Sequence, residues 1–424
     1  MSMNIQITKP IQGGVIAAIA SKAEAHRLLI CAALADDETF IICSSSSEDI
    51  EATVRCVNAL GAVVRHERDG FFVTPVKRSK KSAHLVLDCG ESGSTLRFLL
   101  PVCGALGVRV SFMMAGQLQV RPLSALYDEM VSHGCTLSKP DNSQLYCEGQ
   151  LKSGTYTLPG NMSSQYVSGL LFALPLLSGD SLIAVTGVLE SRPYVEMTLA
   201  ALRLYGISIF AEDGQTFRIP GGQTFCSPKT VKVEGDWSNA AFWLSAGAIG
   251  RNKITCTGLN LDSHQGDRAI IELLTRFGAK ITMENDSVTV SPGILGGIEI
   301  DAADIPDLVP PLAAVASAAE GKTIIRNAGR LRLKESDRLH TVAASLANLG
   351  AEITETEDGL IIVGKEKLTG GETDSFGDHR IVMAAAVLST ACTGPVLIKN
   401  AQAVNKSYPG FFNDFNTALG GKVE

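Results

Sequence analysis

The sequence predicts an α/β protein made of six copies of one βαβαββ unit, divided into two domains of three copies each. Two markers recur along the 424 residues. The first marker is a helix-capping Ser or Asp that leads into a mostly apolar segment, in steps of 71, 71, 73, 71 and 71 residues: Ser21, Ser92, Ser163, Asp236, Asp307 and Asp378. The second marker is a glycine that ends a helical stretch: Gly61, Gly134, Gly206, Gly278, Gly350 and Gly420. A period this long that fills the chain indicates repeated supersecondary units.

Each copy is predicted to contain two helices of different character. The capped helix, as in residues 165–177 and 379–388, is apolar on nearly every side, so we expect it to be buried. The helix that follows is amphipathic. In the first copy Ile50, Val54 and Val57 fall on one face, and a glycine follows as the C-terminal stop.

Two short β-rich runs joined by a turn dipeptide close each copy. The turn dipeptides are Asp69-Gly70, Asp213-Gly214, Asn285-Asp286 and Asp358-Gly359. The chain ends soon after the sixth glycine, so the last copy lacks strands, and the strand-like residues 3–19 are the segment left to supply them. We therefore predict an N-terminal domain of residues 20–233. The C-terminal domain would combine residues 1–19 with 234–424 and be completed by the N-terminal strand.

Composition narrows the functional class. The net charge of −7 and pI near 5.6 argue against a general nucleic-acid binder. No apolar run is long enough for a membrane span, and the N-terminus lacks a signal-like segment, so we expect a cytoplasmic protein without a membrane partner. The ten cysteines form neither a CxxC pair nor a cluster with histidine, which indicates buried free thiols and no metal site.

Cations gather where the helices are predicted to begin, although the chain as a whole is acidic. They are Lys22, Arg27, Arg97, Lys334, Arg338 and Arg380. The N-terminus of a helix carries a partial positive charge and unpaired N–H groups, so further cations there call for an anion. Each one alone could be a surface charge or the partner of a nearby Asp. Their recurrence in register favours a local anion-binding site.

Three motifs carry most of this argument. In LRLKESDRL, residues 331–339, Lys334 and Arg338 are predicted to lie one helical turn apart on one face, either as an ordinary salt-bridged face or as a ligand site. SSQ, residues 163–165, places two hydroxyls and an amide at a helix start, where a capping box is the simpler reading. Asp307, in IPDLVPP, is either a helix cap or a base.

The order and spacing of nine motifs resemble the enolpyruvyl transferase family, in particular the 5-enolpyruvylshikimate-3-phosphate synthases. The motifs are SKxxxxR at 21–27, GxSGSTxR at 90–97, VRP at 120–122, SSQ at 163–165, SRPY at 191–194, IPD at 305–307, LKESDRL at 333–339, DHR at 378–380 and NKSYP at 405–409. The resemblance covers nearly the whole chain. It implies a two-domain α/β prism, also called an inverse α/β barrel, and we expect a monomer.

The resemblance implies that the enolpyruvyl group of phosphoenolpyruvate is transferred to the 5-hydroxyl of shikimate 3-phosphate, with release of phosphate and no cofactor. The implied catalytic residues are Asp307 as base, Glu335 as proton donor, and Lys22. The implied ligands of shikimate 3-phosphate are Lys22, Ala23, Arg27, Ser163, Ser164, Gln165, Ser191, Asp307 and Lys334. The implied ligands of phosphoenolpyruvate are Lys22, Gly93, Arg121, Gln165, Arg338, Arg380 and Lys406.

The chain departs from the usual family pattern at Ala20 and Ala23, where PGSKS becomes IASKA, and at Glu91 and Phe98, which stand for Asn and Pro. Ala23 removes a hydroxyl that normally meets the shikimate phosphate. Three alternatives stay open: a UDP-N-acetylglucosamine enolpyruvyl transferase, an RNA 3′-phosphate cyclase, and a non-catalytic protein that binds anionic metabolites. The first usually carries a catalytic cysteine, which residues 112–123 lack.

Overall fold

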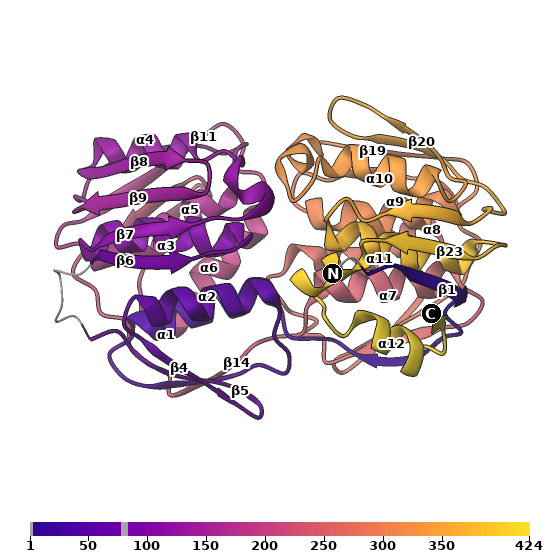
Figure 1. The fold of residues 1–424 in the computed structure, drawn as a ribbon, viewed down its shortest axis with the longest axis horizontal. Coiled ribbons are helices and arrows are strands. Elements are labelled where there is room, and N and C mark those ends of the chain that lie inside the picture. Colours follow the sequence, from indigo (N-terminus) through magenta and orange to yellow (C-terminus); the bar gives the residue numbers. More distant parts are fainter. Residues whose placement is uncertain (1–2, 78–83) are drawn as a thin grey trace. The chain divides into compact units, whose positions relative to one another are not determined.

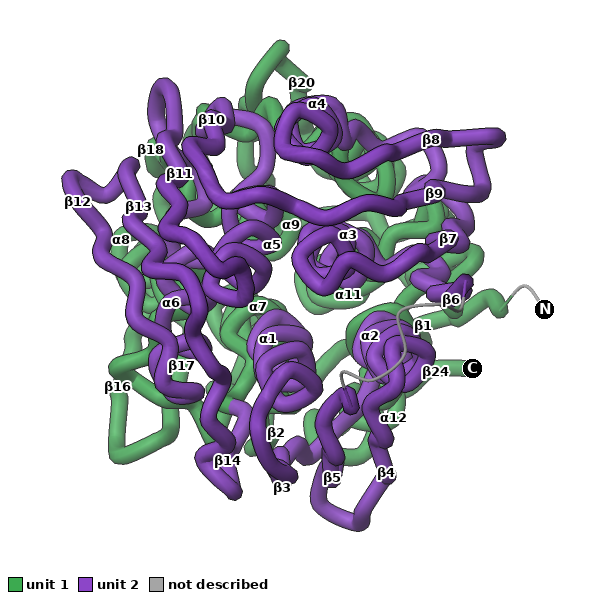
Figure 2. The backbone as a smooth tube through the Cα atoms, turned by 90° about the vertical axis from the view of Figure 1, so that its left-hand side faces the viewer, with its two compact units in different colours: residues 1–21, 234–424 green, residues 22–233 purple. Residues whose placement is uncertain are grey.

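The computed structural model describes residues 3–77 and 84–424. These residues form two compact units (Figure 2). Unit 1 comprises Met1–Ser21 and Glu234–Glu424, and unit 2 comprises Lys22–Val233. The chain leaves unit 1 after Ser21 and re-enters it at Glu234, and the Ser21 N–H donates to the Glu234 carbonyl at 2.8 Å. The outgoing and returning segments are thus paired side by side.

One copy of unit 2 shows the repeat in its simplest order. Its elements are β6 (His84–Asp88), α3 (Gly93–Leu106), β7 (Arg109–Met113), a short 3₁₀ helix η1 (Gly116–Gln119), α4 (Ser124–Ser132), β8 (Cys135–Asp141) and β9 (Gln144–Gly149). The strands form a sheet in the order β6-β7-β9-β8, in which β6 and β7 are parallel and the other pairs are antiparallel. A helix crosses over between the parallel strands, and a hairpin closes the unit.

The other two copies of unit 2 repeat this order. One contains β10 (Thr155–Pro159), α5 (Ser164–Ala173), η2 (Leu174–Leu176), β11 (Ser181–Thr186), α6 (Arg192–Leu204), β12 (Phe210–Glu212) and β13 (Thr216–Ile219). The other contains α1 (Lys22–Leu34), β3 (Thr39–Ile42), α2 (Glu48–Ala59), β4 (Val63–Glu67) and β5 (Gly70–Thr74). Its parallel edge strand, β14 (Thr230–Lys232), comes from the end of the unit.

Unit 1 also holds three copies. The first contains α7 (Trp237–Ile249), β15 (Ile254–Thr257), η3 (Gly266–Ala269), α8 (Ile270–Phe277), β16 (Lys280–Glu284) and β17 (Ser287–Ser291). The second contains β18 (Glu299–Asp301), η4 (Pro306–Leu308), α9 (Val309–Ser317), β19 (Lys322–Arg326), η5 (Gly329–Leu333), α10 (Arg338–Ala347), β20 (Glu352–Glu355) and β21 (Leu360–Val363). The third contains β22 (Gly371–Asp374), α11 (His379–Leu388), η6 (Ser389–Ala391), β23 (Val396–Lys399), η7 (Ala401–Lys406), α12 (Phe411–Thr417) and β24 (Lys422–Val423).

Two N-terminal strands complete sheets of unit 1. β1 (Ile5–Lys9) inserts between β23 and β24 and is antiparallel to both, and Figure 1 shows it in indigo beside β23. β2 (Gly14–Ala17) pairs in parallel with β15. The first and last segments of the chain therefore share one sheet, although more than 380 residues separate Ile5 from its partner Ile398.

The first helix of each copy is the buried one. Every residue of α11 is buried, and α7, α9 and α11 pack on one another in unit 1, as α3 does on α5 in unit 2. The second helices are amphipathic, as in α8, where Ile270, Leu273 and Leu274 are buried and the other face is polar. Apolar residues on every side of the first helices leave them no stable position other than the core.

The glycines and turn dipeptides that mark the repeats have the conformations expected from the sequence. All six repeat glycines have positive φ, which glycine adopts without the steric cost that a Cβ brings. Each of the four turn dipeptides joins two antiparallel strands. The helix predicted over residues 165–177 is shorter, because α5 ends at Ala173 and a 3₁₀ turn containing Pro175 follows. The predicted α/β fold of six repeats is confirmed. Within the described residues, no helix is long and apolar enough to cross a membrane.

Candidate active site

The starts of the buried helices are capped as the repeat predicts at four positions. The side chains of Ser92, Ser163, Asp236 and Asp378 each accept a hydrogen bond from a backbone N–H in the first turn of α3, α5, α7 and α11. Such a bond pairs one of the N–H groups that a helix start leaves without a partner. Polar side chains of neighbouring copies are therefore held at the same end of each unit.

Asp307 does not cap its helix, and this part of the prediction is wrong. α9 begins at Val309, its N-cap residue is Leu308, and Pro310 and Pro311 occupy the second and third helical positions. A capping side chain bonds to the N–H of the second or third position, and proline has none. The two prolines thus leave the Asp307 carboxylate for other partners.

Those partners are two arginines, Arg338 of α10 in the same copy and Arg380 of α11 in the next copy. The Asp307 carboxylate accepts from Arg338 Nη1 and from Arg380 Nη2, each at 2.9 Å. Arg338 is 1% exposed. It also donates through Nε to Asp378 Oδ2 at 2.8 Å and through Nη2 to Glu335. Three carboxylates therefore surround one buried guanidinium in unit 1.

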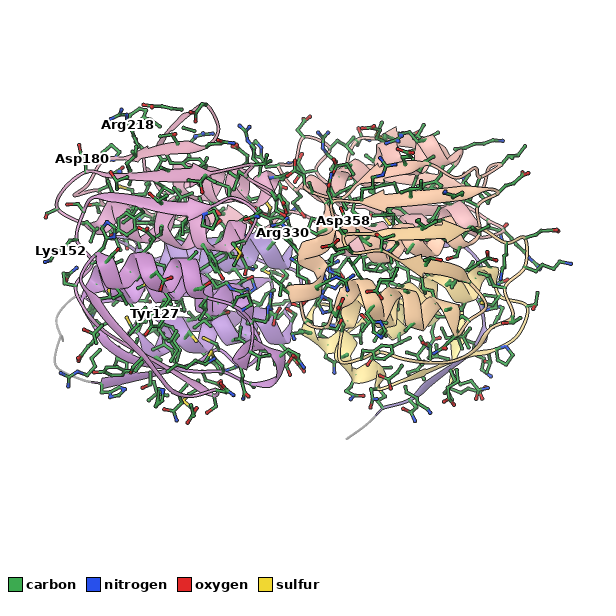
Figure 3. The ribbon with its side chains drawn as sticks, turned by 90° about the horizontal axis from the view of Figure 1, so that it is seen from above. Tyr127, Lys152, Asp180, Arg218, Arg330 and Asp358 are labelled. Atoms are coloured by element: carbon green, nitrogen blue, oxygen red, sulfur yellow. The ribbon has the colours of Figure 1, made fainter. Side chains whose placement is uncertain are left out.

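The charges of this cluster shift the pKa values of its members. Burial raises the pKa of Asp307, but Arg380, Lys334 and Arg338 outweigh that effect and hold it well below the ordinary range of a carboxyl. Burial lowers the pKa of Lys334 to about 8, with Asp307 opposing and Arg338 assisting that effect. Arg330, labelled in Figure 3, also lowers it, and its guanidinium donates to the Ala303 carbonyl at 2.9 Å. Asp307 is thus firmly ionised, while Lys334 can lose its proton at moderately alkaline pH.

Lys334 and Arg338 do not share a helix face, contrary to the prediction from LRLKESDRL. η5 ends at Leu333, Lys334 is extended with φ −88° and ψ −152°, and Asp337 caps α10, which begins at Arg338. The Asp337 cap sets the start of the helix and leaves Lys334 and Glu335 in the loop before it. The charges of both residues nevertheless shift the pKa of Asp307: Lys334 lowers it and Glu335 raises it.

Lys406 is placed on an element next to this cluster. It is the last residue of η7, it is buried, and η7 packs on α11, the helix that carries Arg380. Of the predicted residues of unit 1, ion pairs connect Asp307, Glu335, Arg338 and Arg380 directly, and Lys334 contributes through its charge.

In unit 2, Lys22 opens α1 and forms an ion pair with Asp49 of α2. Lys22 Nζ lies 2.8 Å from Asp49 Oδ2, and the two side chains are 18% and 10% exposed. This is one of the nearby-Asp pairings that the sequence left open as an alternative. An anionic ligand at Lys22 would have to compete with Asp49 or share the ammonium with it.

The starts of α3 and α5 are linked through Gln165. Its Oε1 accepts from Arg97 Nη1 at 2.7 Å, and its Nε2 donates to Ser94 Oγ at 2.9 Å. The guanidinium of Arg121 lies over the same turn, because a Cβ added to Gly93 would stand 2.9 Å from Arg121 Nη1. Gln165, Gly93 and Arg121, predicted separately, thus meet in one place with Arg97.

Arg27 lies deeper than a surface ligand would. It is 2% exposed, and its nitrogens donate to Thr198 Oγ1 and to the carbonyls of Ala23 and Tyr194 at 2.9, 2.6 and 2.7 Å. Burial lowers its pKa to about 10. The guanidinium also lies over the Phe98 ring, 5.1 Å from its centroid. Arg27 therefore already has protein partners on each of its three nitrogens.

The remaining predicted residues of unit 2 are hydroxyls and one alanine. Ser163 caps α5, and Ser164 is its buried first residue. Ser191 precedes α6 with φ 53°, a left-handed conformation that a residue with a side chain adopts at a cost. Ala23 is half-buried in the first turn of α1.

The structure adds residues that the predicted site did not include. Asp49 and Asp378 are the carboxylates that hold Lys22 and Arg338. Arg97 joins Gln165, and its recurrence with the other cations was the signal that could have placed it in the site. The two carboxylates gave no such signal, because each pairs with a residue far along the chain, 27 positions away for Asp49 and 40 for Asp378.

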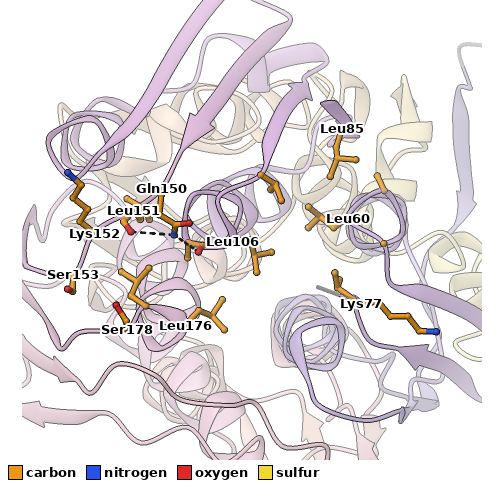
Figure 4. Close-up of a pocket in the computed structure, with 16 residues that line it drawn as sticks. Leu60, Lys77, Leu85, Leu106, Gln150, Leu151, Lys152, Ser153, Leu176 and Ser178 are labelled. Atoms are coloured by element: carbon orange, nitrogen blue, oxygen red, sulfur yellow. Dashed lines mark hydrogen bonds between the residues drawn. The ribbon is translucent and has the colours of Figure 1, made fainter. Parts of the chain in front are cut away.

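A separate cavity of about 780 Å³ lies elsewhere in unit 2 (Figure 4). Six of the sixteen residues that line it are leucines, among them Leu60, Leu106 and Leu176, and it adjoins the C-terminal ends of α2 and α3. None of the predicted site residues lines it. This cavity is therefore separate from the predicted site residues at the helix starts.

The chain matches known proteins over nearly its whole length. The family model of EPSP synthase (3-phosphoshikimate 1-carboxyvinyltransferase) matches residues 5–415. A 3-phosphoshikimate 1-carboxyvinyltransferase of Clostridium kluyveri is 44% identical over 408 residues, which cover 95% of this chain and 94% of that protein. One from Clostridioides difficile is 41% identical over 415 residues, covering 95% and 94%.

Solved structures of lower identity share the fold. An EPSP synthase from Acinetobacter baumannii superposes with a TM-score of 0.83 at 24% identity and covers 100% of both chains. The enolpyruvyl transferase NikO from Streptomyces tendae superposes with a TM-score of 0.79 at 19% identity, covering 100% of this chain and 98% of that one. With the family model and the clostridial relatives, these findings show that the chain is a transferase that belongs to the EPSP synthase family.

Proposed function

We propose that the chain transfers the enolpyruvyl group of phosphoenolpyruvate to the 5-hydroxyl of shikimate 3-phosphate and releases phosphate. The observation that carries the proposal is the pairing of one carboxylate, Asp307, with Arg338 and Arg380. This arrangement would supply a base and two cations for an anionic substrate from one place in unit 1. The clostridial relatives bear the name of this activity.

Phosphoenolpyruvate carries a carboxylate and a phosphate, and planar guanidinium groups bind both with paired hydrogen bonds. Arg338 and Arg380 would supply such bonds from unit 1, together with Lys406. Arg121, Gln165 and the open face of Gly93 would supply the contacts from unit 2, and Lys22 would assist. Gly93 matters because the guanidinium of Arg121 lies where a side chain would otherwise stand.

Shikimate 3-phosphate would be bound by serine hydroxyls and by two cations, Lys334 and Arg27. Ser163, Ser164 and Ser191 offer hydroxyls near helix starts, where anions are stabilised. The pKa of Lys334 is lowered to about 8, chiefly by burial, so Lys334 gives up its proton more readily than an ordinary lysine. Arg27 would hold the binding surface in shape through its three protein contacts as well as by its charge.

The chemistry needs one group that accepts a proton and one that donates it. The 5-hydroxyl oxygen adds to C2 of phosphoenolpyruvate while its proton goes to Asp307, and C3 receives a proton from Glu335. The intermediate then loses a C3 proton and phosphate, which restores the double bond. Asp307 is ionised and ready to accept, but its low pKa makes it a weak base while both arginines hold it.

Substrate binding would correct this weakness. An anion that takes over Arg338 and Arg380 withdraws their charge from Asp307 and adds a negative charge nearby, and both effects raise the pKa of the carboxyl. The base would therefore gain strength when the second substrate is in place. Lys22 would stabilise the negative charge of the intermediate.

A coupled assay of phosphate release tests the proposal. The purified protein is mixed with phosphoenolpyruvate and either shikimate 3-phosphate or UDP-N-acetylglucosamine. Release with shikimate 3-phosphate alone is expected. Release with the nucleotide sugar would assign the chain to the sister reaction, and release with neither acceptor would favour a non-catalytic binding protein.

A further inference from the structure

Asp267 is a buried carboxyl that the proposed reaction does not use. It lies in η3 and is 2% exposed. Its Oδ2 accepts from the hydroxyl of Ser238, in the first turn of α7. Its Oδ1 is buried and has no hydrogen-bond partner among the residues that the structure describes. Half of this carboxyl therefore points into the protein without a donor.

The position is unfavourable for a permanent charge. Among the described residues Asp267 forms no ion pair, and a carboxylate buried without a paired cation or a full set of hydrogen-bond donors is strongly disfavoured relative to its neutral form. The start of α7 offers some stabilisation, but its own cap, Asp236, brings a second negative charge. The neutral, protonated form of Asp267 therefore suits this position better than the ionised form.

The charged groups that face Asp267 belong to the proposed active site. The pKa of Asp267 is raised to about 7, chiefly by burial and also by the charges of Asp307 and Asp236, against the lowering effects of Arg380 and the Ser238 hydroxyl. On its own element, Arg268 points to solvent and donates to the Leu261 carbonyl at 2.6 Å. Asp307 and Arg380 are thus the groups through which a ligand can act on Asp267.

We propose that Asp267 is a positioning residue that takes up one proton from solvent when phosphoenolpyruvate binds at Arg380. This inference rests on the proposed function, because it needs an anion at that arginine. The anion competes for the positive charge of Arg380 and adds negative charge beside Asp307. Protonation of Asp267 forms one O–H bond and removes one negative charge from the cluster, so the bound anion meets less repulsion.

The consequence is a pH dependence with a defined sign. Well below its pKa, which is raised to about 7 chiefly by burial, Asp267 is already protonated and binding needs no proton from solvent. Above pH 7 each binding event must take up a proton that becomes scarcer, so capture of phosphoenolpyruvate weakens as pH rises. A shift of one pKa unit on binding corresponds to about a tenfold loss between the two limits.

The test compares wild type with Asp267→Asn, which has the same shape and no proton to exchange. kcat/KM for phosphoenolpyruvate is measured from pH 6 to pH 9 at saturating shikimate 3-phosphate, where it reports the complex that awaits phosphoenolpyruvate. The ratio of variant to wild type should be near one at pH 6 and rise towards tenfold at pH 9. Ionisation of the substrate phosphate is common to both proteins and cancels. Asp262→Asn, an exposed change in the same loop, should give a flat ratio.

A ratio for Asp267→Asn that is the same at every pH would overturn the inference and leave Asp267 a merely structural role. If that variant does not fold, Ser238→Ala serves instead. The Ser238 hydroxyl lowers the pKa of Asp267, so its loss should move the inflection in the plot of kcat/KM against pH to higher pH. An inflection at the same pH as in wild type would overturn the inference.

Calorimetric titration with phosphoenolpyruvate in two buffers of different ionisation enthalpy separates this inference from the proposed function, because it needs no turnover. Wild type should take up more protons than Asp267→Asn. Equal uptake would overturn the inference even where phosphate release is normal. Excess uptake in a protein that transfers no enolpyruvyl group would support the inference and contradict the proposed function.

Discussion

A methyl group on Gly93 should weaken phosphoenolpyruvate binding without harming the fold. The added Cβ would stand 2.9 Å from Arg121 Nη1 and 3.0 Å from Arg97 Nη1, while ordinary contact begins at 3.4 Å, so Arg121 must retreat by at least 3.4 − 2.9 = 0.5 Å. A retreat of that size removes or bends one charge-assisted hydrogen bond to the ligand. Such a bond is worth about 1.5–3 kcal/mol, which corresponds to roughly a tenfold to hundredfold rise in KM for phosphoenolpyruvate.

Initial rates of phosphate release for Gly93→Ala, with each substrate varied in turn, give both KM values. KM for shikimate 3-phosphate should change less than about threefold, and the thermal midpoint should stay at or slightly above that of wild type, since alanine favours the helix that begins at Gly93. Gly296→Ala is the matched control, because no atom lies within 4 Å of its added Cβ. An unchanged KM for phosphoenolpyruvate, or an equal rise in both KM values, would refute the placement of Arg121 at this substrate.

Three further predictions test individual residues. Asp307→Asn and Glu335→Gln should each lower turnover by about 10²–10⁴-fold while calorimetry still detects both substrates; a variant that kept more than about a tenth of wild-type turnover would not have the proposed role. Ala23→Ser should tighten shikimate 3-phosphate roughly tenfold or more and leave phosphoenolpyruvate unaffected, as measured by calorimetry; equal affinities would mean that another group already binds that oxygen. His26 is buried, and its pKa is lowered to about 3, chiefly by burial. As pH falls below 6.5, His26 therefore becomes protonated in the unfolded chain but stays neutral in the folded protein. Wild type should therefore lose about 2–3 kcal/mol of unfolding free energy between pH 6.5 and 4.5 that His26→Gln retains in urea titrations, and parallel losses would contradict it.

The repeats made the fold predictable, and local physics explains why. A left-handed glycine, a turn dipeptide and a capping side chain each act within a few residues, so the sequence shows them directly. The helix over residues 379–388 is found at the predicted bounds for this reason. The cap predicted at Asp307 is wrong because Pro310 and Pro311 have no N–H to donate to a capping side chain.

The site was less predictable, because its geometry depends on contacts between residues that lie far apart in the sequence. Cations in register with the helix starts indicated an anion site, but no local signal showed that Asp378 holds Arg338 or that Asp49 holds Lys22. These pairs join residues 40 and 27 positions apart. The unpaired oxygen of Asp267 is likewise visible only once the packing around it is known.

Transfer of isotopic label from phosphoenolpyruvate tests the central claim most directly. The protein is incubated with phosphoenolpyruvate labelled with ¹³C at C2 and C3 and with shikimate 3-phosphate, and the products are followed by ¹³C NMR. We expect both labels in an enol ether on the 5-oxygen of shikimate 3-phosphate, formed together with one equivalent of phosphate and greatly slowed by Asp307→Asn. Label found in pyruvate, or left in phosphoenolpyruvate while both substrates are bound, would contradict enolpyruvyl transfer by this chain.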